Sequence, residues 1–310
     1  MTHPTSSSQH GARPTGARLA VIIVAYDSNA VILPCLDSIS RHNPMGTALE
    51  VVVVDNKPDT GLEAAMAERH YTFCPRYVAN ARNNGFGGGN NVGVAHTDAP
   101  HILFLNPDTI VTEDVFSTTV RMLEDDDRLV LGYSLTDPEG RRNDTYSYFP
   151  EYVYIFPLLH LLERLSFLGT VNRLRPVNRI AWPWGAAFAL SRQRFEAAGG
   201  FDENIFLCNE EPDLMRRLPE RRLRILPLRI IHLEGHGRQV PASRYLAFLE
   251  STDYYLRKHR IASRGLYWRW VGMKLRLKKC LRRPIDPTYE EAFSRFRREV
   301  LNHKPNTPQA

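Results

Sequence analysis

The sequence lacks the long apolar runs that membrane-spanning and secreted proteins carry. No stretch of its 310 residues approaches the roughly 20 consecutive apolar residues that a transmembrane helix needs. The most apolar candidate, residues 153–162, is short and contains Pro157 and His160. Residues 1–18 are rich in Ser, Thr, Pro and Gly, contain no apolar secretion core, and are interpreted as a disordered lead-in. We therefore expect a cytoplasmic protein.

Cysteine is scarce as well. The chain has four cysteines, Cys35, Cys74, Cys208 and Cys280, and none of them forms the close pair that zinc sites use. This spacing argues against a disulfide framework. The apolar content of 43% and the charged content of 24% are typical of a soluble globular protein, and the length suffices for one large α/β core.

The first part of the chain alternates between strand and helix patterns. Residues 19–25 are a continuous apolar run of strand length, and further strands are predicted at residues 49–54, 76–79 and 101–105. Helical patterns fill residues 29–41 and 61–70 between them. Strands that alternate with helices in this way predict a parallel sheet with helices on both faces.

The second half is less regular. Residues 146–168 favour a loop and one amphipathic helix, and residues 182–190 a strand entered through a turn. A short helix is expected at residues 191–198, a loop and a helix at 201–217, and a strand at 223–231 with Pro227 at an edge. No internal repeat and no linker divides the chain, so we expect one domain.

Polar and mostly acidic residues follow three of the predicted strands. They are Tyr26-Asp27, Asp55-Asn56 and Asn106-Pro107-Asp108. In parallel sheets the ligand lies beyond the carboxyl ends of the strands, so these groups converge on one edge. A carboxylate on a loop fixed by proline can hold Mg²⁺ or Mn²⁺ against substrate phosphates. By itself, the segment 106–108 also has the composition of an ordinary turn.

Residues 83–91 form a segment rich in glycine and asparagine, which we expect to be a turn that enters a helix ending near residue 96. Glycine permits close backbone approach, and a helix that begins there offers free N–H groups to phosphate. The glycine spacing matches neither the dinucleotide-binding signature nor the P-loop. Taken alone, the segment could equally be structural.

Three acids, Glu210, Glu211 and Asp213, lie at the opening of the helix predicted within residues 201–217. They could simply cap the helix, because its dipole favours negative charge at that end. One of them could instead act as a general base for an acceptor hydroxyl. Arg217 follows Asp213 by four residues and could pair with it on one helix face.

Taken together and in this order, several segments resemble the inverting family 2 glycosyltransferases, and among these the bacterial rhamnosyltransferases that use dTDP-rhamnose. They are residues 21–26, 51–56, 83–91, 104–108 and 210–214, within a resemblance that covers about residues 19–260. The resemblance implies an α/β protein of the GT-A fold, with a single Rossmann-like, mostly parallel sheet flanked by helices over residues 19–256.

The resemblance also assigns donor-binding residues. Ala25, Tyr26 and Asp55 would line the nucleoside pocket, and Asp55 would accept a hydrogen bond from the pyrimidine base. Asn84, Gly85 and Asn90 would run beside the donor. Asp108 would hold the metal on the diphosphate, and Asn106 would occupy the other end of the Asp-X-Asp motif of the family. His232 and His236 fall in the histidine segment near the diphosphate, although an exposed histidine at a strand end is the alternative.

On the acceptor side, the resemblance places Trp184, Gly185 and Ala186. Glu211 occupies the position of the catalytic base, with Glu210, Asp213, Leu214 and Arg217 in register. Three departures affect specificity: Asp27 stands where the family has Asn, Glu211 replaces the more common Asp, and Pro212 follows it.

The last part of the chain, residues 257–310, is expected to form a basic and helical C-terminal extension. From Arg257 to Arg283 there are many Lys and Arg residues and no Asp or Glu. Basic residues interleaved with aromatic and aliphatic ones suit an amphipathic helix that lies on an anionic membrane. A solvated helical face is the plain alternative, and a nucleic-acid partner is not expected.

These features predict an inverting, metal-dependent hexosyltransferase at the inner face of the plasma membrane. It would move rhamnose from dTDP-rhamnose to a hydroxyl of a glycan or lipid-linked saccharide in cell-envelope polysaccharide synthesis, with galactofuranose and glucose left open as donor sugars. One alternative is a sugar nucleotidyltransferase, although residues 26–29 lack the basic glycine-rich loop of that class. The other is a non-catalytic nucleotide-sugar-binding protein.

Overall fold

The computed structural model describes residues 16–58, 60–152, 169–233 and 241–301. Most of the predicted lead-in, the helix predicted within residues 146–168, and His236 therefore lie outside the described residues. Among the helices that are described, none combines the length and the apolarity needed to cross a membrane.

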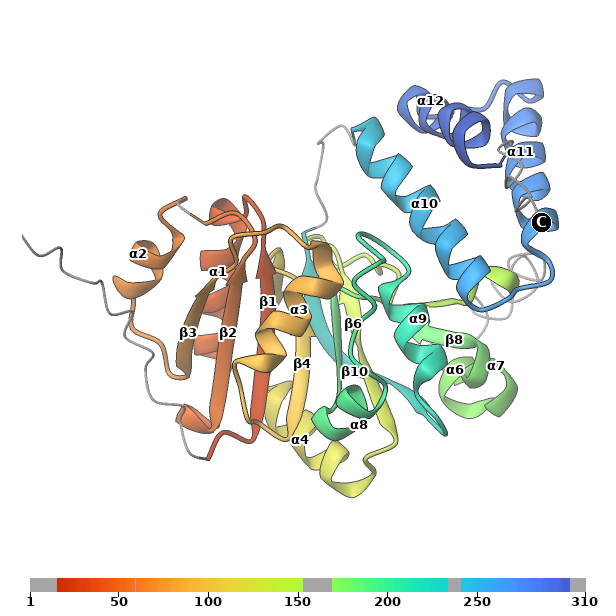
Figure 1. The fold of residues 1–310 in the computed structure, drawn as a ribbon. Coiled ribbons are helices and arrows are strands. Elements are labelled where there is room, and N and C mark those ends of the chain that lie inside the picture. Colours follow the sequence, from red (N-terminus) through yellow and green to blue (C-terminus); the bar gives the residue numbers. More distant parts are fainter. Residues whose placement is uncertain (1–15, 59, 153–168, 234–240, 302–310) are drawn as a thin grey trace, which may run out of the picture.

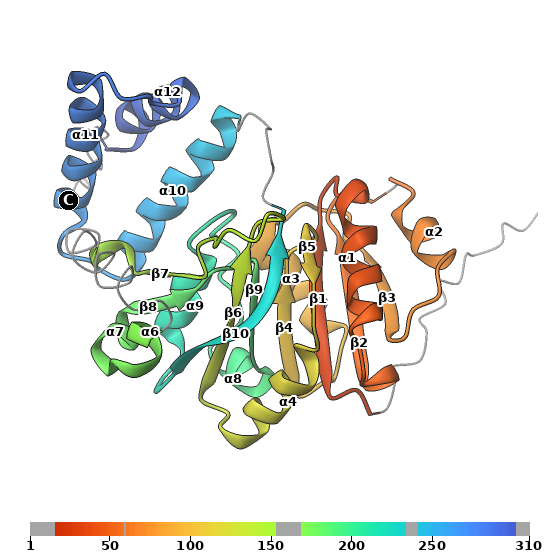
Figure 2. The same cartoon turned by 180° about the vertical axis from the view of Figure 1, so that it is seen from behind.

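The core of the protein is an eight-stranded sheet in the order β3-β2-β1-β4-β9-β6-β10-β5 (Figures 1 and 2). The strands are β1 (Leu19–Ala25), β2 (Leu49–Asp55), β3 (Cys74–Ala79), β4 (His101–Leu105), β5 (Thr109–Val111), β6 (Leu129–Thr136), β9 (Ala187–Ser191) and β10 (Arg222–His232). β9 runs antiparallel to β4 and β6, and β5 runs antiparallel to β10. The remaining pairs are parallel, which confirms the predicted mostly parallel sheet.

Helices cover both faces of the sheet. Figure 1 shows α3 (Gly85–Ala95), α8 (Arg192–Ala197) and α9 (Glu210–Arg217) in front of it, and Figure 2 shows α1 (Asn29–Arg41) and α4 (Phe116–Asp125) on the other side. Alternate side chains of β1 point to opposite faces, so Ala20 and Ile22 join one core while Val21 and Ile23 join the other. β1 is therefore apolar throughout.

The helix that was predicted to end near residue 96 is present, but it already takes up most of the segment 83–91, where a turn was expected. α3 begins at Gly85, and Gly89 and Gly93 face the sheet one helical turn apart. A Cβ atom on Gly89 would lie 2.7 Å from Cγ1 of Val24, and one on Gly93 would overlap Ile22. Glycine has a low helix propensity, but here the missing side chain lets the helix backbone approach the sheet. The stabilisation from this packing outweighs the low helix propensity.

Residues 109–136 contain elements that the sequence pattern did not reveal, namely β5, α4 and β6. The strand predicted at residues 182–190 consists of two: β8 (Ala181–Pro183), which pairs with β7 (Tyr146–Tyr148) in a small separate sheet, and β9. β10 lies between β6 and β5, and Pro227 falls in a register shift between Leu226 and Arg229. A bulge accommodates this proline because it needs no ladder hydrogen bond.

Short helices complete the part of the chain that precedes α10. They are η1 (Gly46–Ala48), α2 (Leu62–Ala67), η2 (Pro150–Tyr152), α6 (Gly169–Arg173) and α7 (Arg175–Ile180).

The C-terminal part is helical, as predicted, and stands beside the sheet next to α9 (Figures 1 and 2). It comprises α10 (Ala242–Lys258), α11 (Arg264–Cys280), α12 (Pro287–Phe296) and η3 (Arg297–Leu301). On α11, Trp268 packs against Phe296 of α12 with ring centroids 4.7 Å apart. α10 begins at Ala242 and ends at Lys258, so it includes residue 257, at which the sequence predicted the start of the C-terminal extension.

Candidate active site

The polar residues predicted at the strand ends lie at one edge of the sheet, the edge at which β10 ends at the top of Figure 2. β9 begins at this edge because it runs antiparallel to β4, with Leu105 paired to Ala187. The backbone N–H of Asn106 donates to the carbonyl of Ala186 over 2.9 Å. The loop that carries Asp108 therefore lies beside the turn that carries Gly185.

The structure brings Ala25, Tyr26 and Asp55 together at the ends of β1 and β2. Ala25 and Asp55 are paired in register. The buried carboxylate of Asp55 accepts hydrogen bonds from the hydroxyl of Tyr77 and from the backbone N–H of Lys57, each over 3.0 Å. The side chain of Tyr26 is 55% exposed beside it. An exposed ring next to a fixed hydrogen-bond acceptor is a suitable surface for a flat heterocyclic base.

A network of asparagine side chains fixes the start of α3. Asn56 donates to the carbonyl of Gly85 over 3.0 Å, and Asn80 donates to both Asn56 and Asn84 over 2.7 and 2.9 Å. Gly85 has a φ of 77°, and a Cβ atom there would overlap the carbonyl of Phe206. Asn80 was not singled out from the sequence, because amide networks have no motif.

Asn90 is buried, and its amide donates to the carbonyl of Phe86, one turn earlier in α3, over 3.0 Å. The structure thus gives this predicted donor-binding residue a partner within its own helix.

Asp108 and His232 meet across β5 and β10. His232 is paired in register with Thr109, and its Nε2 lies 3.3 Å from Oδ1 of Asp108. Adjacent ligands of an octahedral Mg²⁺ site, at about 2.1 Å from the ion, are separated by about 3 Å, so this pair fits one cation. Across residues 16–58, 60–152, 169–233 and 241–301, no group of three or more His, Cys, Asp or Glu side chains could hold a metal ion. A cation on this pair would therefore need phosphate and water oxygens to complete its shell.

Glu211 lies against the turn before β9. A Cβ atom on Gly185 would overlap the Glu211 carboxylate, so only glycine leaves room for this acid. Burial raises the pKa of Glu211 to about 7. Burial, followed by the charge of Glu211, raises the pKa of Glu210 well above its usual value. Among the described residues, Oε1 of Glu210 has no hydrogen-bond partner.

Trp184 stacks on Trp182 beside this turn, with ring centroids 5.5 Å apart and an interplanar angle of 14°. Asn106, Ala186, Gly185 and Glu211 thus form a continuous line of contacts along the sheet edge. The Glu211 side chain and the loop that carries Asp108 therefore lie along the same stretch of the sheet edge.

Asp213 and Arg217 make the ion pair that their spacing predicts, with Nε of Arg217 donating to Asp213 over 2.9 Å. The Asp213 carboxylate is fully buried and also contacts Lys258 and His259, over 2.7 and 2.8 Å. Burial would raise the pKa of Asp213, but the bonds to His259 and Lys258 hold it below its usual value. Arg217 also donates to the carbonyls of Ala198 and Gly200. Both side chains are thus committed to bonds within the protein that join α9 to its surroundings.

Two known glycosyltransferases resemble this chain over most of its length. The rhamnosyltransferase WbbL of Escherichia coli K12 is 27% identical over 261 residues, which cover 78% of this chain and 94% of WbbL. The low-salt glycan biosynthesis hexosyltransferase Agl10 of Haloferax volcanii is 24% identical over 257 residues, covering 80% of this chain and 78% of Agl10.

Among solved structures, the mannosyltransferase PcManGT of Pyrobaculum calidifontis, in complex with GDP-Man and Mn²⁺, superposes with a TM-score of 0.56 at 17% identity. The match covers 91% of this chain and 75% of that one. This likeness confirms the GT-A fold. The family model for glycosyl transferase family 2 matches residues 20–189, which is more than half of the chain. The chain therefore belongs to glycosyl transferase family 2.

Proposed function

We propose that this protein is an inverting, metal-dependent glycosyltransferase that moves a sugar from a nucleotide-diphosphate donor to a hydroxyl of a glycan or lipid-linked saccharide. The observation that carries the proposal is the Glu211 carboxylate, seated against Gly185 on the sheet edge that also carries Asp108 and His232. A carboxylate with a pKa of about 7 is suited to take a proton near neutral pH.

For the donor, the exposed ring of Tyr26 beside the Asp55 carboxylate supports binding of a nucleotide base. The likeness to WbbL and to the structure with GDP-Man supports a nucleotide sugar, and we propose dTDP-rhamnose. The likeness to Agl10 keeps other hexoses in consideration. A panel of dTDP, UDP and GDP sugars, read out by release of the nucleotide diphosphate, distinguishes them.

Asp108 and His232 are the residues that would hold Mg²⁺ or Mn²⁺, because their oxygen and nitrogen atoms are spaced for one cation. A divalent ion bound there would supply positive charge that stabilises the departing diphosphate. Asn106, on the same loop, would orient the sugar or phosphate by hydrogen bonding.

In the proposed reaction, the acceptor hydroxyl attacks the anomeric carbon from the side opposite the diphosphate. A carbon–oxygen bond to the acceptor forms as the bond to the diphosphate breaks, which inverts the anomeric centre. Glu211 accepts the hydroxyl proton, and the nucleotide diphosphate leaves with the bonding electrons. Trp184, Gly185 and Ala186 border the position from which the acceptor would approach.

Replacing Glu211 by Gln tests this assignment. The amide keeps the shape of the side chain but takes no proton, so we expect kcat to fall by about 10²–10⁴-fold. Donor binding, measured as a thermal shift with and without Mn²⁺, should remain, because a bound ligand still raises the melting temperature. Glu68→Gln, on an exposed glutamate, serves as the matched control.

If Glu211→Gln keeps the wild-type kcat, the assigned base is wrong. Wild-type protein that binds donors but never releases a nucleotide diphosphate would indicate a non-catalytic binding protein. Pyrophosphate release from a nucleoside triphosphate and a sugar phosphate would indicate a nucleotidyltransferase.

We further propose that the helical C-terminal part rests on the inner face of the plasma membrane, near a lipid-linked acceptor of cell-envelope polysaccharide synthesis. Four large apolar side chains are exposed near its basic residues, namely Leu266, Met273, Leu277 and Leu281. Apolar side chains among cations suit a surface of anionic lipid.

A further inference from the structure

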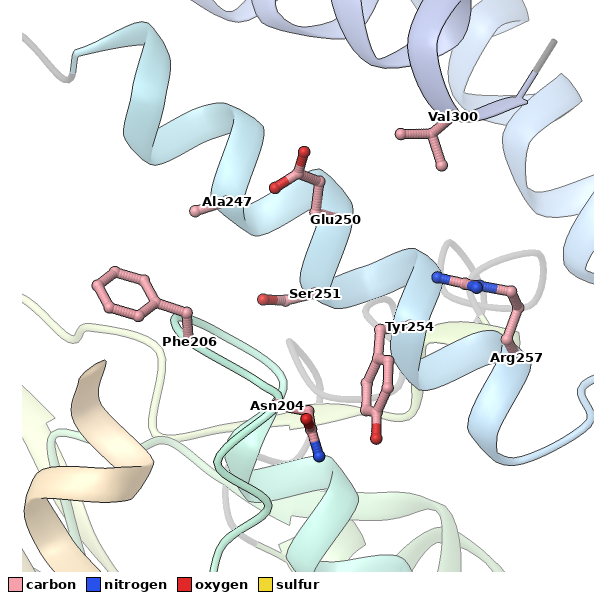
Figure 3. A pocket seen from close by; sticks show the side chains of 8 residues that line it. All are labelled: Asn204, Phe206, Ala247, Glu250, Ser251, Tyr254, Arg257 and Val300. Atoms are coloured by element: carbon pink, nitrogen blue, oxygen red, sulfur yellow. The ribbon is translucent and has the colours of Figure 1, made fainter. Parts of the chain in front are cut away.

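A cavity of about 420 Å³ lies between α10 and the loop that leads into α9 (Figure 3). Its volume falls within the range of small-molecule sites. In Figure 3, Ser251 and Tyr254 project from α10 toward the loop that carries Asn204 and Phe206. The roles proposed above for the donor, the metal and the base use none of these residues.

The loop with Phe206 separates this cavity from the donor side of the site. On one side, the carbonyl of Phe206 touches Gly85 at the start of α3 and accepts from the N–H of Phe86 over 3.4 Å. On the other side, the ring of Phe206 lines the cavity and is 46% exposed. One face of this loop therefore contacts α3, the helix beside the predicted donor site, and the other face lines the cavity.

The same loop continues directly to the predicted base. Glu211 follows Phe206 by five residues, and the sharp turn between them places Cys208 and Asn209 in the left-handed region, with φ of 65° and 72°. The amide of Asn209 donates to the hydroxyl of Thr252 over 3.0 Å. Thr252 adjoins Ser251, so the wall of the cavity on α10 is bonded to the residue that immediately precedes the two glutamates.

The chemistry of the lining favours a ligand rich in hydroxyl groups. The face of an aromatic ring carries partial negative charge and attracts the C–H groups on the apolar face of a sugar, and Phe206 and Tyr254 offer such faces. The hydroxyl of Tyr254 donates to Asp202 over 2.9 Å, which holds its ring in place.

Glu250 and Arg257 add one acceptor group and one donor group. Within the described part of the chain, Glu250 has no ion-pair partner, so its carboxylate is available to hydroxyl donors. Because the lining carries one charge of each sign, it favours an uncharged saccharide over a phosphate.

We propose that this cavity binds a sugar unit of the saccharide acceptor and directs the attacking hydroxyl toward Glu211. This inference rests on the proposed function, because it names the acceptor side of the same reaction.

Saturation-transfer NMR with four probes tests the cavity directly: the methyl glycosides of glucose, galactose, N-acetylglucosamine and rhamnose. We expect wild-type protein to give signals with at least one glycoside, and Phe206→Ala and Glu250→Ala to lose them. Both side chains are exposed enough that truncation opens no core cavity, and Glu250→Gln provides a milder second variant. Leu266→Ala and Glu291→Ala, at exposed positions outside the cavity, are the matched controls.

The result separates this inference from the proposed function. Donor binding, measured as a thermal shift with Mn²⁺, should be unchanged in Phe206→Ala and Glu250→Ala, since both substitutions change only side chains that line the cavity and leave the backbone contact of Phe206 with α3 in place. Glycoside signals that are absent from wild-type protein, or that persist in both alanine variants, would overturn the acceptor assignment. A wild-type protein that gives glycoside signals but no shift with any donor would instead refute the proposed function.

Discussion

Glu211 owes its position to the absence of a side chain at Gly185. Any Cβ atom on Gly185 would occupy the space of the carboxylate, so a larger residue would displace the acid from the sheet edge. On the same helix, Glu210 is buried beside it, and two ionised carboxylates cannot be accommodated there at low cost. We therefore expect only one of the two carboxyl groups to be ionised at a time, so that Glu210 remains protonated when Glu211 has lost its proton.

The raised pKa of Glu211 predicts the pH dependence of turnover. Only the ionised carboxylate accepts a proton, so kcat should be low where Glu211 is protonated and should rise as pH increases through about 7. The measurement is kcat at saturating donor and acceptor between about pH 5 and about pH 9, with thermal unfolding recorded at each pH to exclude denaturation. A kcat that stays flat from about pH 6 to about pH 8 would contradict the assignment of Glu211 as base.

Single residues at this site were predictable where the reason was local. Asp213 and Arg217 form an ion pair because residues four apart lie on the same helix face. This spacing can be read from the sequence, so the ion pair could be predicted. The contacts of Asp213 with Lys258 and His259 could not be predicted, since α10 returns to α9 only in the folded chain. The approach of His232 to Asp108 likewise depends on how β10 pairs with β5.

At the scale of elements, the buried parallel strands were the most predictable part of the fold. β1 is apolar throughout, and β2 and β4 are apolar over most of their length, because helices cover both faces of the sheet, and this pattern is visible without a structure. The start of α3 was predicted too late, because its glycines favour a loop in isolation. The helix needs glycine because the side chains of Ile22 and Val24 on β1 lie too close to α3 to leave room for a Cβ atom.

α10 is joined to α9 by a buried ionic cluster. Nζ of Lys258 lies 2.7 Å from both Asp202 and Asp213, and the Asp213 carboxylate is fully buried. Burial would raise the pKa of Asp202, but the bond from Lys258 contributes to holding it well below its usual range. Lys258 therefore supplies positive charge to two acids that belong to the catalytic part of the chain.

Removing this lysine should loosen the junction between α9 and α10. Lys258→Met keeps most of the apolar stem but leaves a buried carboxylate with one cation fewer, so we expect a loss of about 1–3 kcal/mol in the free energy of unfolding. Urea denaturation measures the change. Lys274→Met, on an exposed lysine of α11, is the control and should alter stability by less than about 0.5 kcal/mol. Equal stability of the two variants would show that the cluster does not hold the helices together.

At the scale of the whole molecule, the outward face of α11 is the feature most suited to a membrane. Leu266, Met273 and Leu277 are spaced by seven and four residues, so they lie along one side of the helix, and Leu281 follows just beyond its end. Trp268 occupies the other side, where it packs against α12, so the apolar stripe is exposed. The basic residues beside the stripe include Arg269, Lys274, Arg276 and Lys278.

Sedimentation of the full chain with vesicles tests whether this stripe contacts lipid. We expect binding to vesicles that contain phosphatidylglycerol, weaker binding to pure phosphatidylcholine, and a further loss at high salt, which screens the charges. The double variant Met273→Gln/Leu277→Gln keeps every charge but removes apolar side chains, and should lower vesicle affinity by about tenfold or more. Leu174→Gln changes a similarly exposed apolar residue outside the C-terminal helices and should bind like the wild type. Equal sedimentation with both lipids would refute the preference for an anionic membrane, and wild-type binding by the double variant would mean that the apolar stripe does not contact lipid.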